Sequence, residues 1–147
     1  MLAAIDSLWA ALPLGMRVGY GFVFGALNGW FAGVVIERAP KGIGISGLGD
    51  SPRSQCVCGR LLPMRENIPI VSYLLLRGHA RCCGARIPPW YFAVELGMGL
   101  WWALAWTLPW LLAALTASAS GFALLVLSGL MHQRRASRAT RRANHQS

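Results

Sequence analysis

The sequence predicts an all-α integral membrane protein with about three transmembrane helices and one cytoplasmic loop domain. Hydrophobic residues make up 55% of the 147 residues and charged residues only 13%, whereas soluble domains are roughly 25% charged. Residues 18–36 contain no charged side chain. A helix over this range would reach roughly 28 Å, close to the hydrocarbon thickness of a bilayer. We therefore expect a transmembrane helix over 18–36.

The second apolar region needs to be divided. Between Arg86 and Arg134 the only charged residue is Glu95. One helix over 96–131 would be roughly 54 Å long, too long for one span. The segment WTLPW, residues 106–110, offers a proline and interfacial tryptophans, which favour a reversal there. A turn at 118–121 would leave too few residues for the last span, so we expect transmembrane helices over 90–107 and 110–131.

The basic residues predict the orientation. All Lys and Arg residues except Arg17 lie in 37–89 or in 132–147. The positive-inside rule then places the loop 37–89 and the basic tail 132–147 in the cytoplasm and the N-terminus outside, which three spans satisfy. We therefore attribute the net charge of +9 mainly to the orientation of the chain in the membrane. We expect the tail to face anionic membrane lipids, and we expect no nucleic-acid partner.

The N-terminal segment 1–17 lacks a positive charge before its apolar part, so it does not resemble a signal peptide. Ile5, Leu8, Trp9 and Leu12 follow helical spacing, which predicts a short amphipathic helix on the outer face. In the first span, glycines recur at every fourth position of 21–33. Such a stripe permits close helix packing, against this chain's own later spans or, alternatively, against another subunit.

Four cysteines occur in two pairs within the loop: Cys56 with Cys58, and Cys82 with Cys83. A reducing cytoplasm disfavours structural disulfides, so these pairs indicate a zinc site that would staple the loop. The spacing departs from the usual C-x-x-C, and adjacent cysteines rarely bind one ion together. His79 is an alternative ligand, and buried or reactive thiols are the alternative to a metal.

The segment KGIGISGLGD, residues 41–50, contains both G-x-G-x-x-G and G-x-G-D. The first pattern marks a dinucleotide site only when it follows a strand and opens a helix. The second would need an apolar span around it and a second aspartate nearby. Neither context is present, so we interpret the segment as a cytoplasmic linker and Asp50 as a solvated turn residue.

The segment CGRLLPMRENIPIVSYLLLRGHARCCGARIPPWYFAVEL, residues 58–96, closely resembles the N-terminal cytoplasmic module of bacterial type IV prepilin peptidases, the leader peptidase/N-methyltransferases. GWFAGVVIERAP, residues 29–40, resembles the end of that family's first span, and the resemblance covers about 19–100. It implies a multi-pass protein of the bacterial inner membrane with a periplasmic N-terminus. The matching positions include Ser54, Cys58, Gly59, Asn67, Ile68, Pro69, Ser72, Gly78, Cys83, Gly84, Ala85, Ile87, Tyr91 and Glu95.

Several positions depart from the family pattern. The first cysteine of the second pair falls on Ala80, and Cys82 occupies a variable position. The first pair is one residue too short, and Glu66 replaces the usual aspartate. The family's peptidase uses two aspartates on later spans, one of them in G-x-G-D. This chain has only Asp6 and Asp50, predicted on opposite sides of the membrane, so we expect no peptidase activity from this chain alone.

The resemblance implies an accessory or methyltransferase-associated module for the maturation of type IV pilins and type II secretion pseudopilins. It implies S-adenosylmethionine as cofactor, and a separate peptidase subunit, prepilins or secretion-system proteins as partners. The catalytic candidates are Glu66 and Glu95; a solvated or helix-capping role is the alternative for Glu66, and an ion pair with Arg86 for Glu95. The alternative functions are a non-enzymatic scaffold of a pilus or secretion assembly, or a degenerate prepilin peptidase fragment.

Overall fold

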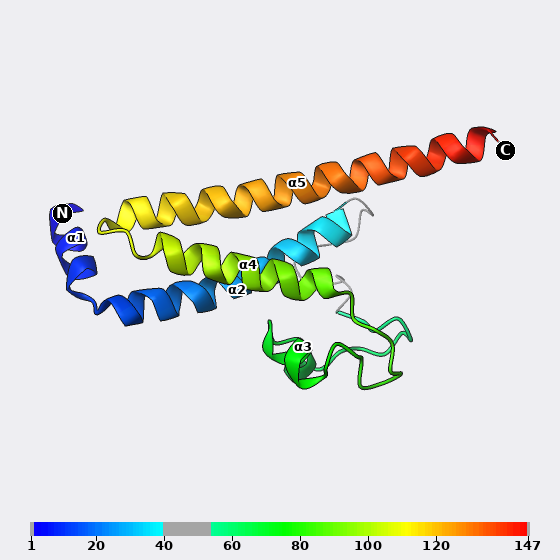
Figure 1. The fold of residues 1–147 in the computed structure, drawn as a ribbon, viewed down its shortest axis with the longest axis horizontal. Coiled ribbons are helices and arrows are strands. Elements are labelled where there is room, and N and C mark those ends of the chain that lie inside the picture. The colour runs from blue at the N-terminus through cyan, green and yellow to red at the C-terminus, as the bar shows by residue number, and fades with distance from the viewer. Residues whose placement is uncertain (1, 40–53, 147) are drawn as a thin grey trace.

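The computed structural model describes residues 2–39 and 54–146, and these residues form helices joined by loops (Figure 1). Within this described part there is no strand, only two isolated β-bridges in the cysteine-bearing loop. The prediction of an all-α fold is therefore confirmed. The helices are α1 (Leu2–Ala11), α2 (Leu14–Arg38), α3 (Val71–Leu75), α4 (Pro89–Ala105) and α5 (Leu111–Gln146), with a 3₁₀ turn at Met64–Glu66.

The three long helices run in alternating directions, so the cysteine-bearing loop and the end of α5 lie toward the same end of the molecule (Figure 1). Prolines lie at the starts of two of these helices: Pro13 directly precedes α2, and α4 begins with Pro89. Proline suits these positions because its missing N–H would have no partner in a first helical turn. The chain reverses between Ala105 and Leu111, the segment that contains Pro109.

Helix α4 covers the glycine stripe of α2. A Cβ at Gly29 would lie 2.8 Å from the Cα of Glu95, and one at Gly21 would lie 2.9 Å from the carbonyl oxygen of Trp102. Gly99 of α4 meets the ring of Phe22 in return. Small residues on both helices thus let the two backbones approach closely. The stripe is used within the chain, and this packing leaves it covered rather than open to another subunit.

Helix α5 packs along the other two helices through small and aromatic residues. The Trp101 indole N–H donates to the carbonyl oxygen of Ala117 at 2.9 Å, and the indole lies against Gly121. Phe31 and Phe122 stack with their ring centroids 6.4 Å apart. The opposite face of α5 leaves large apolar side chains exposed, among them Leu112, Leu115, Leu124, Leu127 and Met131.

Two stretches of the described helices are long and apolar enough to cross a membrane, Leu14–Arg38 and Leu111–Arg135. Between them, α4 has 17 residues and two buried positions at its centre, Met98 and Gly99. The segment 41–50, with Asp50, lies outside the described residues, so the structure does not test the interpretation of its glycines as a linker.

Helix α1 is fastened to the turn between α4 and α5. The Trp9 indole N–H and the Arg17 guanidinium both donate to the carbonyl oxygen of Leu108, at 3.0 and 3.1 Å. The Asp6 carboxylate accepts the N–H of Leu111 at 3.1 Å and so caps the first turn of α5. Of the predicted amphipathic stripe, Trp9 is buried while Leu8 is exposed.

Candidate functional site

The four cysteines sit on two tight turns of the loop. In the first turn the N–H of Cys56 donates to Arg60 at 2.9 Å, and the N–H of Gly59 donates to Cys56 at 2.8 Å. Gly59 has φ +81°, a left-handed conformation that glycine adopts without the clash a Cβ causes. This turn holds the thiols of Cys56 and Cys58 on one side of the loop.

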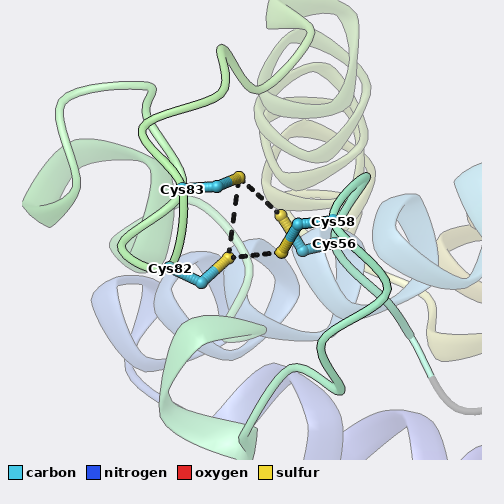
Figure 2. A group of neighbouring side chains, drawn as sticks. All are labelled: Cys56, Cys58, Cys82 and Cys83. Carbon is cyan, nitrogen blue, oxygen red and sulfur yellow. Dashed lines mark hydrogen bonds between the residues drawn. The ribbon is translucent and has the colours of Figure 1, made fainter.

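The second turn has the same construction. The N–H of Ala80 donates to the carbonyl oxygen of Ala85, and the N–H of Gly84 donates to Ala80, both at 2.8 Å. Gly84 has φ +69°. The turn directs Cys82 and Cys83 toward the first pair, and all four sulfurs face a common centre (Figure 2). Cys82 and Cys83 are adjacent in the sequence, which predicts that they bind one ion poorly. In the structure both thiols nevertheless belong to the same cluster.

The four Sγ atoms lie within 4.8 Å of one another and could hold a metal ion. The Sγ atoms of Cys56 and Cys83 are 3.4 Å apart, as are those of Cys58 and Cys82, and those of Cys82 and Cys83 are 3.8 Å apart. All four cysteines are free of disulfides. With Zn–S bonds of about 2.3 Å, the sulfurs of a tetrahedral site lie roughly 3.8 Å apart. The thiols present therefore fit a tetrahedral thiolate-bound ion with only small movements.

Thiol crowding also shifts the pKa values. The backbone N–H of Cys58, with the thiols of Cys82 and Cys83, stabilises the Cys56 thiolate and lowers its pKa from 9.0 to about 7. The proximity of Cys56, and then of Cys58, raises the pKa of Cys82 to about 12. A second thiolate so close to the first is unfavourable unless a cation neutralises both. A divalent metal would supply that charge.

His79 is not part of the cluster, so its alternative role as a ligand is wrong for this structure. Its Nδ1 lies 2.8 Å from the carbonyl oxygen of Arg77, and the metal-capable group consists of the four cysteines, as judged on the described residues. The sequence placed His79 near the second pair but could not show where its ring points.

A cavity of about 530 Å³ lies between the loop and the neighbouring ends of α2 and α4. Its lining includes Cys56 as well as both catalytic candidates, Glu66 and Glu95. Two further lining residues come from the second half of α2, Trp30 and Glu37, and neither was predicted from the sequence. Glu37 accepts a short hydrogen bond from the Tyr91 hydroxyl. In the described part of the chain, the sequence indicated a role for Glu37 only through its position directly after an apolar span.

Glu66 is buried, with only 4% of its side chain exposed, so the alternative of a solvated carboxylate is wrong. Among the residues that the structure describes, none donates a hydrogen bond to its Oε1 atom. The guanidinium Nε of Arg81 lies 4.0 Å away, at the outer limit of an ion pair, and the Arg81 side chain is 62% exposed. An ion pair with so exposed a partner stabilises little, and Glu66 thus keeps a desolvated acceptor at the cavity.

Glu95 anchors the loop to α4. Its carboxylate accepts the backbone N–H of Ile70 at 2.7 Å, so the partner in the structure is this N–H and not Arg86. Ile70 has φ +61°, which a β-branched residue rarely adopts. Next to it, the Ser72 hydroxyl accepts the N–H of Ile68 at 2.8 Å and donates to Arg65 at 3.1 Å.

Residues 23–108 match the profile of the family described as Bacterial Peptidase A24 N-terminal domain. The chain is 34% identical to a prepilin leader peptidase/N-methyltransferase of Burkholderia pseudomallei, over 62% of this chain and 37% of the relative. It is 45% identical to one of Myxococcus xanthus, over 54% and 23%, and 37% identical to one of Klebsiella pneumoniae, over 57% and 38%. The chain thus spans well under half the length of these relatives. No solved structure matches it.

Proposed function

Because the chain belongs to the bacterial peptidase A24 N-terminal domain family, we propose that it is a metal-stapled membrane module that serves the maturation of type IV prepilins and type II secretion pseudopilins. The observation that carries the proposal is the closed loop module itself: two cysteine turns meet in one thiol cluster beside a cavity that buried carboxylates line. Relatives of this chain bear the name prepilin leader peptidase/N-methyltransferase.

The module holds zinc through Cys56, Cys58, Cys82 and Cys83. The short distances between their sulfurs support this, and zinc prefers tetrahedral thiolate sites. The ion's role is structural: it ties the two turns together in a loop that has few buried apolar side chains of its own. The cavity wall that includes Cys56 then depends on the metal for its shape.

The chain crosses the bacterial inner membrane three times, with the loop and the basic tail in the cytoplasm and the N-terminus in the periplasm. The alternating directions of α2, α4 and α5 support this arrangement (Figure 1). The 17 residues of α4 would reach roughly 26 Å, slightly less than the hydrocarbon thickness of a bilayer, which is about 30 Å. The turn that follows α4 covers the short remaining distance. The exposed apolar side chains of α5 then face lipid.

Within prepilin maturation, the proposed role is methyl transfer or its support, with S-adenosylmethionine as methyl donor and the processed pilin as acceptor. Peptide cleavage is assigned to a separate subunit, because aspartate-catalysed hydrolysis needs two carboxylates that act together. Asp6 instead caps α5 at the end of the molecule opposite the loop. The cavity offers Glu66 and Glu95 to a ligand, with Glu95 already engaged by Ile70.

The test combines the purified full chain with a separate prepilin peptidase that lacks methyltransferase activity, a prepilin and labelled S-adenosylmethionine. We expect label in the processed pilin only when the chain is present, and reduced labelling with a Cys58→Ser/Cys83→Ser variant. Cleavage of prepilin by the chain alone would contradict the assignment of peptidase activity to another subunit. Stable binding to the peptidase without any label in the pilin would favour the non-enzymatic scaffold.

A further inference from the structure

Two close sulfur contacts join one cysteine turn to the other. The Sγ atoms of Cys56 and Cys83 are 3.4 Å apart, as are those of Cys58 and Cys82, whereas the Sγ atoms of the sequence neighbours Cys82 and Cys83 are 3.8 Å apart. In Figure 2 both of the shorter contacts run from one turn to the other. The chain has four cysteines, so every intramolecular disulfide that it can form is a bond within this cluster.

The cysteine spacing decides which disulfides are favourable. Four cysteines can form two disulfides in three ways, and one of these joins Cys56 to Cys58 and Cys82 to Cys83. The Cα atoms of adjacent residues lie about 3.8 Å apart, which is below the usual separation of about 4.4–6.8 Å in a disulfide. A bond between Cys82 and Cys83 would therefore be strained. Of the two other ways, the 3.4 Å contacts favour Cys56 with Cys83 and Cys58 with Cys82.

Each turn is held together by its own backbone hydrogen bonds. An antiparallel bridge joins Gln55 to Leu61 in the first turn, and another joins His79 to Arg86 in the second. The turns are therefore formed independently of the sulfur contacts between them. To make a bond of about 2.05 Å, two sulfurs that are 3.4 Å apart need side-chain rotation and a small approach of the turns. Neither turn has to refold.

Small oxidants can reach the cluster, because Cys58 and Cys83 are exposed and each belongs to a different close pair. A thiolate attacks hydrogen peroxide: an S–O bond forms, the O–O bond breaks, and the departing hydroxide takes up a proton to become water. The facing thiolate then attacks the sulfenic acid, so that the S–S bond forms, the S–O bond breaks and a second water leaves. In total, four thiols and two peroxides give two disulfides and four waters.

We propose that the cluster is a reversible redox modification site, at which peroxide converts the four thiols into the disulfides Cys56–Cys83 and Cys58–Cys82. Both bonds join the two turns, so the oxidised loop stays closed while a bound metal ion loses its four thiolate ligands. Disulfides in the cytoplasm are usually transient or redox-sensing, which suits a reversible change. The release of metal rests on the proposed function, whereas the pairing of the thiols rests on their distances and spacing alone.

The test treats the purified, metal-loaded full chain with hydrogen peroxide and then reduces half of each sample with dithiothreitol. We expect the intact mass to fall by four hydrogen atoms, zinc to pass to a chromogenic chelator, and reduction with added zinc to reverse both changes. After cleavage at arginines between the turns, such as Arg65 and Arg77, the peptides of the two turns should remain joined until reduction. Separate peptides before reduction, or a gain of oxygen without loss of hydrogen, would overturn the proposal.

Two variants that keep one cysteine in each turn test the pairing. Cys56→Ser/Cys83→Ser keeps Cys58 with Cys82, whose sulfurs are 3.4 Å apart, and Cys56→Ser/Cys82→Ser keeps Cys58 with Cys83 as the matched control. We expect the first variant to form its disulfide about tenfold faster at the same peroxide concentration, because the rate depends on the position of the reacting atoms. Equal rates in the two variants would contradict the pairing.

Proteolysis of the wild-type loop provides a further readout. Under chelation, the oxidised chain should resist cleavage in 54–88, and it should become sensitive once dithiothreitol reduces the disulfides. Equal cleavage of the oxidised and reduced metal-free chains would contradict the closure of the loop by these bonds. Formation of both disulfides in a chain that is purified without zinc would uphold the pairing and count against the metal site of the proposed function alone.

Discussion

The Glu95 carboxylate accepts the backbone N–H of Ile70 at 2.7 Å, and together with the stacking of Tyr73 on Phe92 this bond joins the cysteine-bearing loop to α4. Glu95 is buried, and Ile70 has a left-handed backbone conformation that costs about 1–3 kcal/mol unless its surroundings hold it. The carboxylate thus fixes both the position and the conformation of the loop where it enters α3.

Replacing Glu95 should loosen the loop. In Glu95→Ala the Ile70 N–H loses its acceptor, and we expect the free energy of unfolding to fall by about 1–3 kcal/mol. Glu95→Gln keeps an acceptor oxygen and should lose less. Thermal unfolding in detergent measures the stability, and limited proteolysis of 54–88 measures the loosening. Equal protease resistance in all three proteins would show that this bond does not hold the loop.

Metal removal should have a similar local effect. We expect the purified chain to contain one zinc ion, and Cys58→Ser/Cys83→Ser to contain none, because two of its four ligands are gone. Val57→Ser is the matched control: it adds a hydroxyl to the same turn at a side chain that is 87% exposed. Elemental analysis gives the metal content. Chelation should increase cleavage of 54–88, and unchanged cleavage after complete metal loss would contradict the stapling role.

The pH dependence of alkylation should distinguish the cysteines in the metal-free chain. Only the thiolate reacts, and the pKa of Cys56 is lowered to about 7 while that of Cys82 is raised to about 12. Cys56 should therefore react at neutral pH, with a rate that falls as the pH drops below about 7. Cys82 should stay unreactive until far higher pH. Mass spectrometry of iodoacetamide adducts measures both rates, and the same midpoint for both thiols would refute the assignment.

The same shifts fix the sign of the pH effect on stability. The lowered pKa of Cys56 contributes stability that is present above its ordinary value of 9.0 and is lost as the pH falls through about 7. The raised pKa of Cys82 contributes stability that is present below 9.0 and is lost as the pH rises toward about 12. Both contributions should diminish in the metal-loaded protein, where the ligands stay deprotonated.

A side chain at Gly29 should disrupt the packing of α2 on α4. The added Cβ would lie 2.8 Å from the Cα of Glu95, a backbone atom that cannot move away alone. We expect Gly29→Ala to reduce the free energy of unfolding by about 1–3 kcal/mol. Gly19→Ala, on the same helix with nothing within 4 Å of its Cβ, should be neutral or slightly stabilising. Equal unfolding midpoints for both variants would contradict this close packing.

The cap on α5 predicts a smaller loss. Asp6→Ala removes the acceptor for the Leu111 N–H, which should reduce the free energy of unfolding by about 0.5–2 kcal/mol. Asp6→Asn keeps an acceptor oxygen and should lie close to the wild type. The difference between their unfolding midpoints measures how much the cap contributes to stability. Equal midpoints for the alanine and asparagine variants would contradict a capping role for Asp6.

Local patterns predicted where the three long helices lie, because apolar runs and prolines such as Pro109 act within a few residues of themselves. They did not predict that α5 continues to Gln146 or that α3 forms within the loop. The cysteine pairs could be recognised in the same way. The partner of Glu95 could not, since every residue other than proline offers a backbone N–H and only the folded loop selects Ile70. The burial of Glu66 depends likewise on how the loop closes over α2 and α4, which spacing within the sequence does not record.

The hydrogen bonds that join α1 to the turn between α4 and α5 have a consequence for the order of folding. Trp9 and its acceptor Leu108 are 99 positions apart in the chain, so during synthesis α1 emerges long before the turn that receives it. The hydrogen bond from Trp9 can form only after the turn between α4 and α5 has been synthesised. Until then the buried face of Trp9 lacks the partner that it has in the folded chain.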